Sequence, residues 1–262
     1  MSDESAGSDA RRVALVTGAG RGIGRAAAVA LAAQGFQVMA AARTRGELAQ
    51  LADEIGASWL TADLASAGEC ERTVTETLAR LGRIDVLVNN AGAGSAAEHE
   101  VWLQDPARWR ATMALNLDAP FELSRLALPG MLERGGGRIV MVASLASLGA
   151  GVAPRMSAYA ASKHGVLGLA RAIAIEVAGT GVTCNAVLPG SVRTATAELR
   201  VSKEAELAGT TVDEAWAARA ARTPAGRLVE TAEVAATIAF LASDAASGIN
   251  GEAISVALQS YG

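Results

Sequence analysis

Aromatic residues, cysteines and histidines are all scarce in this chain of 262 residues. Aromatic residues make up only 3% of it, so alanine and valine must fill much of any core. The two cysteines, Cys70 and Cys184, are too few for a disulfide framework, which favours a reducing, cytoplasmic setting. The two histidines, His99 and His164, have no partner at metal-ligand spacing, so the sequence predicts no metal site.

Charge and long apolar runs are also limited. The net charge is −4, which argues against a binding surface for nucleic acid. No apolar run reaches the roughly 18 residues that suggest a membrane span, so we expect no membrane partner. Residues 1–10 are polar and acidic without an apolar segment, and we interpret them as a flexible leader and not as a signal peptide.

Short apolar runs alternate with longer helical patterns along the rest of the chain. The expected strands are 12–17, 36–42, 58–63, 84–90, 138–144, 181–189 and 252–258. Among the helices between them, one at 120–134 contains Pro129, which should bend or end it. Strands separated by such helices form right-handed parallel units. With no linker or break in composition, the prediction is one α/β domain over residues 11–262. It is a doubly wound, Rossmann-type parallel sheet of about seven strands with helices on both faces.

A glycine-rich stretch, TGAGRGIG (17–24), joins the first expected strand to the first helix. Glycines permit a tight turn there and let the backbone approach a pyrophosphate at the positive end of the helix. Such a stretch alone could be no more than a tight turn. Its position between a first strand and a helix favours a dinucleotide site.

The end of the second strand bears on which dinucleotide binds. An acidic residue there suits the ribose of NAD, whereas a basic residue suits the 2′-phosphate of NADP. This strand runs into Arg43 and Arg45 with no acid, and Arg21 in the glycine stretch adds a further cation. NADP(H) is therefore favoured and NAD(H) remains possible. The alternative is that Arg43 and Arg45 are solvated surface charges.

The stretch YAASK (159–163) places Tyr159 and Lys163 four residues apart in an expected helix at 157–178. Residues at this spacing share one helix face, with Cβ atoms about 5–6 Å apart. An ammonium beside a phenol lowers the phenol pKa toward working pH, where a general acid is most effective. The alternative is a partly buried helix tyrosine whose hydroxyl bonds a neighbour.

Taken in order, these motifs resemble the short-chain dehydrogenase/reductase family. Besides TGAGRGIG and YAASK, the resemblance rests on Asp63, NNAG (89–92), Asn116, Ser144, and Pro189-Gly190 with Thr194. The resemblance implies that Asn116, Ser144, Tyr159 and Lys163 form the catalytic group. It implies that the cofactor is bound by Tyr159, Lys163 and the following residues: Gly18, Arg21, Gly22, Ile23, Gly24, Arg43, Asp63, Leu64, Asn90, Ala91, Gly92, Pro189, Gly190, Val192 and Thr194.

One spacing departs from the family pattern. Ser144 precedes Tyr159 by 15 residues, where the family usually has about 12 to 14, so the loop between them carries an insertion. Ser147 is a competitor at the shorter spacing. We favour Ser144 because it ends an expected strand, where a fixed backbone can direct the hydroxyl.

The stretches GMLERGGGRIV (130–140) and GRLVETAEVAATIAFLAS (226–243) are similar to 3-oxoacyl-thioester reductases and to ketoreductases of aromatic polyketide assembly. The expected activity is therefore NADP(H)-dependent reduction of a ketone, a β-keto thioester or polyketide-like carbonyl, to a secondary alcohol. The alternatives are an NAD(P)-dependent dehydrogenase of a cyclic or other secondary alcohol, or a catalytically silent dinucleotide sensor.

Two further features concern access and assembly. The polar, helix-prone segment 194–226 is interpreted as a substrate lid, and Trp216 within it is a candidate substrate contact. The 157–178 helix is apolar nearly all round, which predicts cover by a second subunit and hence a homodimer or homotetramer.

Overall fold

The computed structural model describes residues 11–94, 99–149, 152 and 154–258. The expected leader at 1–10 and part of the loop between Ser144 and Tyr159 lie outside the described residues. No helix in these ranges is both long and apolar enough to cross a membrane.

A seven-stranded parallel sheet forms the centre, in the order β3-β2-β1-β4-β5-β6-β7. Its strands are β1 (Val13–Thr17), β2 (Gln37–Ala42), β3 (Ser58–Thr61), β4 (Val86–Asn89), β5 (Gly137–Val142), β6 (Val182–Pro189) and β7 (Ala253–Val256). The side chains of β1, β4 and β6 are buried throughout, because helices cover both faces of a parallel sheet. The prediction of a doubly wound, single-domain α/β fold is confirmed.

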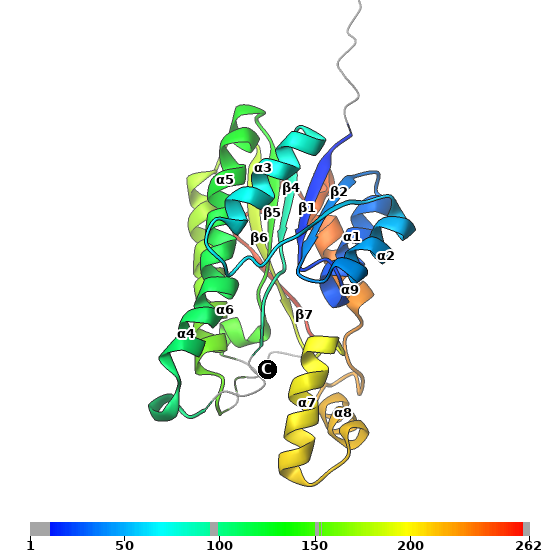
Figure 1. The fold of residues 1–262 in the computed structure, drawn as a ribbon, viewed down its shortest axis with the longest axis vertical. Coiled ribbons are helices and arrows are strands. Elements are labelled where there is room, and N and C mark those ends of the chain that lie inside the picture. Colours follow the sequence, from blue (N-terminus) through cyan, green and yellow to red (C-terminus); the bar gives the residue numbers. More distant parts are fainter. Residues whose placement is uncertain (1–10, 95–98, 150–151, 153, 259–262) are drawn as a thin grey trace, which may run out of the picture.

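The helices form two layers (Figure 1). One core cluster packs α1 (Gly22–Ala33), α2 (Arg45–Ile55) and α9 (Thr231–Ala242) on one face of the sheet. The other cluster packs α3 (Glu69–Leu81), α5 (Ala119–Glu133) and α6 (Ser157–Glu176) on the opposite face. The shorter elements are the helix α4 (Pro106–Met113), a π-helical turn η2 (Ala114–Asp118), and the 3-10 turns η1 (Val101–Leu103), η3 (Leu145–Leu148) and η4 (Asp244–Ala246).

The helices α7 (Ala195–Ala208) and α8 (Val212–Ala221) follow β6 and project below the carboxyl end of the sheet (Figure 1). They pack on each other and span most of residues 194–226, the segment interpreted from the sequence as a substrate lid. The strand order reverses direction between β1 and β4. In such sheets, ligands bind outside the carboxyl ends of the strands at this switch point.

Two features of the helices bear on the sequence-based expectations. Helix α5 does not end at Pro129 but continues to Glu133. Helix α6 is largely covered within its own chain, since Val166, Leu167 and Ile173 are buried in the core. Among the large apolar residues of α6, only Ile175, at 78% exposed, stands far out into solvent. Much of the apolar surface of α6 is therefore buried within this chain, and Ile175 lies on the part that is exposed.

Candidate active site

A cavity of about 500 Å³ opens at the carboxyl end of the sheet, at the switch point between β1 and β4. Residues from the turn after β1, the ends of β2, β4, β5 and β6, and helices α6, α7 and α8 line it. Among the sequence-predicted site residues, all except Gly24 and Asn116 line this one cavity.

Thr17 and Asn90 join the ends of β1 and β4 above the cavity floor. The Thr17 hydroxyl donates to the Val88 carbonyl at 3.1 Å and accepts from the amides of Asn90 and Ala91, both at 3.0 Å. In return, Asn90 Nδ2 donates to the Thr17 carbonyl at 2.8 Å. The glycine turn and the NNAG segment are therefore held as one rigid unit. Thr17 is the first residue of the TGAGRGIG stretch, and sequence reasoning missed this role because the glycines alone suggest the site.

The glycine turn is tightly packed and needs glycine at several positions. Gly18 and Gly22 have φ values of +63° and +58°, which favour glycine. A Cβ on Gly18 would lie 2.8 Å from Asn90 Nδ2, and one on Gly24 would lie 2.3 Å from the Gly18 carbonyl oxygen. Gly24 thus permits α1 to pack closely behind the turn without lining the cavity. The N-terminus of α1 carries no acidic residue in its first turn, so its positive end suits a phosphate.

The end of the cavity after β2 and β3, where the sequence predicts the adenosine of the cofactor, contains charges of both signs. Arg43 is exposed and lines the cavity, whereas Arg45 lies over the Trp59 ring at 5.7 Å and does not. Arg21 also lines the cavity, with Nη1 at 3.8 Å from Glu47 Oε1. Glu47 lies in the first turn of α2 and lines the cavity as well. Sequence reasoning missed this acid because it examined the strand end alone.

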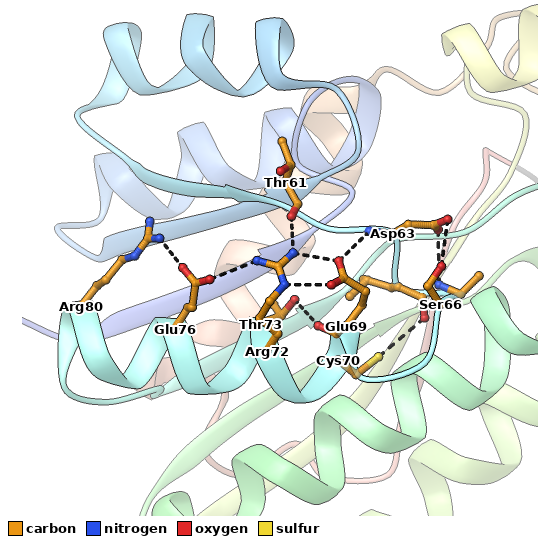
Figure 2. Close-up of polar contacts among 11 residues, drawn as sticks. Thr61, Asp63, Ser66, Glu69, Cys70, Arg72, Thr73, Glu76 and Arg80 are labelled. Atoms are coloured by element: carbon orange, nitrogen blue, oxygen red, sulfur yellow. Dashed lines mark hydrogen bonds and ion pairs between the residues drawn. The ribbon is translucent and has the colours of Figure 1, made fainter.

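Asp63 sits beside a network of charged side chains on α3 (Figure 2). Its backbone N–H donates to Glu69 Oε2 at 3.2 Å, and Ser66 Oγ donates to its carboxylate at 3.3 Å. Arg72 bonds Glu69 in two places and reaches the Thr61 carbonyl at 2.5 Å. Bonding to Arg72 lowers the pKa of Glu69. The network fixes the chain after β3, where Asp63 and Leu64 face the cavity.

Tyr159 lies in the first turn of α6, partly exposed at the cavity wall. Burial raises its pKa, while hydrogen bonding with Ser144 and the charge of Arg200 lower it. The expectation that Lys163 draws this pKa down was wrong for this arrangement, because the lysine is directed elsewhere. The phenol is consequently protonated at neutral pH.

Lys163 is 6% exposed, and Nζ donates to the Val142 carbonyl at 2.8 Å. Burial lowers its pKa to about 8. A Cβ on Gly92 would lie 3.4 Å from Nζ, so glycine at this position leaves room for the ammonium next to the cavity. No carboxylate in the described part of the chain pairs with Lys163 in an ion pair, which leaves its charge available to a bound group.

Ser144 and Ser147 occupy different environments. β5 ends at Val142, two residues before Ser144, whereas the sequence predicted a strand that includes Ser144. Ser144 instead caps the 3-10 turn η3, where its hydroxyl accepts from the Ala146 amide at 3.2 Å. Ser144 lines the cavity. Ser147 is buried and donates to the Lys163 carbonyl at 2.8 Å. Of the two serines, Ser144 is therefore the one that can offer its hydroxyl to a ligand.

Asn116 is fully buried in the π-helical turn between α4 and α5 and does not line the cavity. Its Oδ1 accepts from the Ala93 amide at 2.9 Å, and its Nδ2 donates to the Ala93 carbonyl at 3.0 Å. Nδ2 also donates to Ser162 Oγ at 3.0 Å. π-Helical turns are rare in proteins overall, but those that occur are often found at functional sites. In this protein the turn aligns Asn116 between the segment after β4 and α6.

The opposite end of the cavity is formed after β6. A Cβ on Gly190 would lie 2.9 Å from the Ala257 Cα, so only glycine permits this close approach. Val192 forms a parallel bridge with Val229. Thr194 caps α7 by accepting from the Ala197 amide at 3.2 Å. These contacts hold the segment from Pro189 to Thr194 beside the glycine turn, where Thr194 approaches Gly22.

Sequence reasoning missed two basic residues of this site. Arg200 of α7 and Arg219 of α8 both line the cavity, and no motif marks either of them. Trp216, the candidate substrate contact, is 4% exposed; it lines the cavity, and its Nε1 donates to Glu198 Oε2 at 2.9 Å. Arg193 and Arg219 lie over its ring at 5.5 and 5.8 Å.

This combination of a switch-point cavity, a glycine turn and a cluster of Ser144, Tyr159 and Lys163 defines a dinucleotide-binding protein equipped for proton transfer. The family model described as short chain dehydrogenase matches residues 12–205, and the chain belongs to this family. It is an oxidoreductase acting on alcohol or carbonyl groups of small molecules with a nicotinamide dinucleotide cofactor.

Individual relatives resemble the whole chain. A D-beta-hydroxybutyrate dehydrogenase of Cupriavidus necator is 38% identical over 92% of this chain and 94% of its own. A monensin polyketide synthase putative ketoacyl reductase of Streptomyces virginiae is 41% identical over 94% of this chain and 95% of its own. The crystal structure of a variant actinorhodin polyketide ketoreductase with NADPH superposes with a TM-score of 0.89, at 36% identity, over 94% of this chain and 96% of that one.

Proposed function

We propose that this protein reduces a ketone to a secondary alcohol with NADPH and catalyses the reverse reaction with NADP⁺, with Tyr159 as the proton donor. The favoured substrate is a β-keto thioester or a polyketide-like carbonyl. The observation that carries the proposal is the cavity in which the glycine turn, Ser144, Tyr159 and Lys163 meet. Two similar proteins bear the names of polyketide ketoreductases, which supports carbonyl reduction.

The chemistry divides between cofactor and protein. The bound nicotinamide supplies the hydride. Ser144 donates a hydrogen bond to the carbonyl oxygen, where negative charge develops. Tyr159 donates its proton to the same oxygen, and its raised pKa keeps that proton in place until the oxygen becomes basic. The serine and tyrosine therefore act on one atom of the substrate.

Lys163 and Asn116 support the tyrosine. With a pKa of about 8, Lys163 is largely protonated at neutral pH and would hold the ribose hydroxyls of the cofactor. Asn116 holds the Ala93 backbone on one side and Ser162 on α6 on the other. We propose that it positions a water that links Lys163 to solvent.

The preference for NADP(H) rests on Arg21 and Arg43, which line the adenosine end where a 2′-phosphate would lie. The similar actinorhodin ketoreductase was crystallised with NADPH, which supports it. Glu47 opposes this preference, because its carboxylate attracts Arg21 and repels a phosphate.

A second candidate is an NAD(P)-dependent dehydrogenase of a secondary alcohol. Two observations favour it: Glu47 is an acid at the adenosine end, and one relative is named a D-beta-hydroxybutyrate dehydrogenase. Steady-state rates in both directions with each cofactor distinguish the candidates, since they differ in which cofactor and which direction has the higher kcat/KM.

The test of the proposal is a Tyr159→Phe variant, with Tyr261→Phe, which changes the only other tyrosine, as the matched control. We expect Tyr159→Phe to lose more than about 100-fold in kcat while NADPH binding, followed by fluorescence titration, stays within about threefold. Equal turnover of a carbonyl panel by wild type and Tyr159→Phe would refute the role of Tyr159 as the acid.

Access and assembly are further parts of the proposal. We propose that α7 and α8 form a lid over the substrate, since Arg200, Trp216 and Arg219 of these helices line the cavity. We propose a homodimer or homotetramer, supported by exposed Phe121, Leu132 and Ile175 on the outer helices. The buried free thiols of Cys70 and Cys184 fit a reducing cytoplasm.

A further inference from the structure

The charges that line the cavity are unevenly distributed. Among the described residues, its acidic ones, Glu47 and Asp63, both lie at the adenosine end, after β2 and β3. At the other end, around Tyr159, the ionic residues of the described lining are Lys163, Arg200 and Arg219, all of them basic. The part of the cavity that receives the substrate is therefore cationic.

Of the two arginines of α7 and α8 that line the cavity, Arg200 is the one whose charge acts on Tyr159. Its Nη1 lies 3.7 Å from the sulfur of Met156, the residue that precedes α6. It does not belong to the pyrophosphate end. Thr194 approaches Gly22 at the start of α7, and Arg200 lies six residues further on, about 9 Å along a helix axis.

The acidic partner of Arg200 does not cancel this charge. Glu204 Oε1 lies 3.1 Å from Arg200 Nε, and the same carboxylate also pairs with Arg219. One carboxylate therefore serves two guanidinium groups, and Glu204 itself does not line the cavity. A net positive charge remains where the arginines face the cavity. A guanidinium partly removed from water favours a bidentate anionic partner.

We propose that the substrate of this protein carries an anionic oxygen group, a carboxylate or a phosphate, which Arg200 binds while the carbonyl lies at Ser144 and Tyr159. Arg219 adds to the attraction from α8. The inference rests on the proposed ketone reduction and specifies which ketones the site selects. Arg200 is thus a specificity residue, because it distinguishes an anionic substrate from a neutral one of the same shape.

Two sources can provide such a group. A free oxo acid carries a carboxylate close to its carbonyl. A carrier-bound thioester carries its phosphate at the far end of the pantetheine arm, so the arm must fold back for that phosphate to reach Arg200. Matched substrate pairs separate them. The first pair is acetoacetate and its neutral methyl ester. The second pair is acetoacetyl-CoA and the neutral N-acetylcysteamine thioester. A neutral cyclic ketone, cyclohexanone, tests reduction alone.

The variants are Arg200→Gln and Arg200→Lys, with Arg193→Gln as the matched control. Arg193 belongs to the same region and pairs with Glu198 and Asp213, but it does not line the cavity. We expect wild type and Arg193→Gln to prefer the anionic member of at least one pair. We expect Arg200→Gln to lower kcat/KM for that member by about 10- to 100-fold, mostly through KM. Arg200→Lys should restore part of the loss, and the neutral member should change by less than about threefold.

The pair that shows the preference identifies the source, carboxylate or phosphate. The inference is overturned if neither pair shows a preference, or if Arg200→Gln lowers anionic and neutral substrates equally. It is also overturned if Arg200→Gln weakens NADPH binding by tenfold or more in a fluorescence titration, since Arg200 would then serve the cofactor. Failure of wild type to reduce any of these carbonyls, including cyclohexanone, would instead contradict the proposed function.

Discussion

Because Lys163 is buried, the stability of the folded protein should depend on pH, and the size of this effect can be worked out from the structure. The lysine is 6% exposed, and burial lowers its pKa from 10.5 to about 8. Between these two values the unfolded chain holds a proton that the folded chain releases. Stability therefore rises with pH through this window at about 1.4 kcal/mol per pH unit. Below pH 8 the folded protein bears the full cost of the buried charge.

The perturbation is Lys163→Met, which removes the charge and keeps most of the volume. Integrating between pH 7 and pH 9.5, the stability of wild type should rise by about 2 kcal/mol relative to the variant. Other groups that titrate in this range, including thiols exposed on unfolding, contribute equally to both proteins and cancel in the difference. The variant also loses the bond to the Val142 carbonyl, but that loss shifts the whole curve without changing its slope.

The assay is urea unfolding of both proteins at one fixed concentration, without added nucleotide, at half-unit pH steps. Two-state behaviour is checked by coincident fluorescence and circular dichroism transitions. A difference between wild type and variant that stays constant within about 0.5 kcal/mol from pH 7 to pH 9.5 would refute the reasoning. It would mean that Lys163 reaches water in the folded state.

Three other predictions concern single sites. Ser144→Ala should lower kcat for ketone reduction by about 10- to 1,000-fold, because in the proposed mechanism the serine hydroxyl bonds the developing oxyanion. Ser147→Ala should chiefly lower the melting temperature, because it loses the bond to the Lys163 carbonyl. The reverse pattern in steady-state and melting assays would exchange their roles. Glu47→Gln should tighten NADPH binding and leave NADH binding unchanged in fluorescence titrations, because it removes a charge that repels the 2′-phosphate. The gain should be only about two- to fivefold, since the Arg21–Glu47 pair is exposed and weak. Equal shifts for both cofactors would contradict this. Gly24→Ala should destabilise the protein or abolish cofactor binding, because the added carbon would lie 2.3 Å from the Gly18 carbonyl oxygen. The control Gly46→Ala should be neutral or stabilising in thermal unfolding, because its added carbon would have no atom within 4 Å.

The fold could be predicted because its signals are local and repeated. Each buried parallel strand is a short apolar run, and each crossover is a helix of ten or more residues, so the alternation defines the sheet. Motif residues such as Tyr159, Ser144 and Gly18 could be located for a related reason, since they follow strand ends or begin helices. Parallel strands bring their carboxyl ends to one edge, so residues far apart in the chain meet there.

Electrostatic environment could not be predicted in the same way. Spacing placed Lys163 on the same helix face as Tyr159, yet Nζ is directed to the Val142 carbonyl on β5. The burial that raises the pKa of Tyr159 and lowers that of Lys163 comes from the whole fold around α6, and no helical pattern encodes it.

The residues that we propose decide selectivity, Glu47 and Arg200, belong to no sequence motif. Glu47 lies four residues beyond Arg43, yet it reaches the Arg21 side of the cavity because α2 folds back over the glycine turn. Arg200 lies on a helix whose only sequence signal is polarity. Its charge acts on Tyr159, and both residues line the same cavity. In the proposed function, the motif residues perform the reaction itself. These two charges, one at each end of the cavity, can change without disturbing that reaction, so the choice of cofactor and substrate should reside in them.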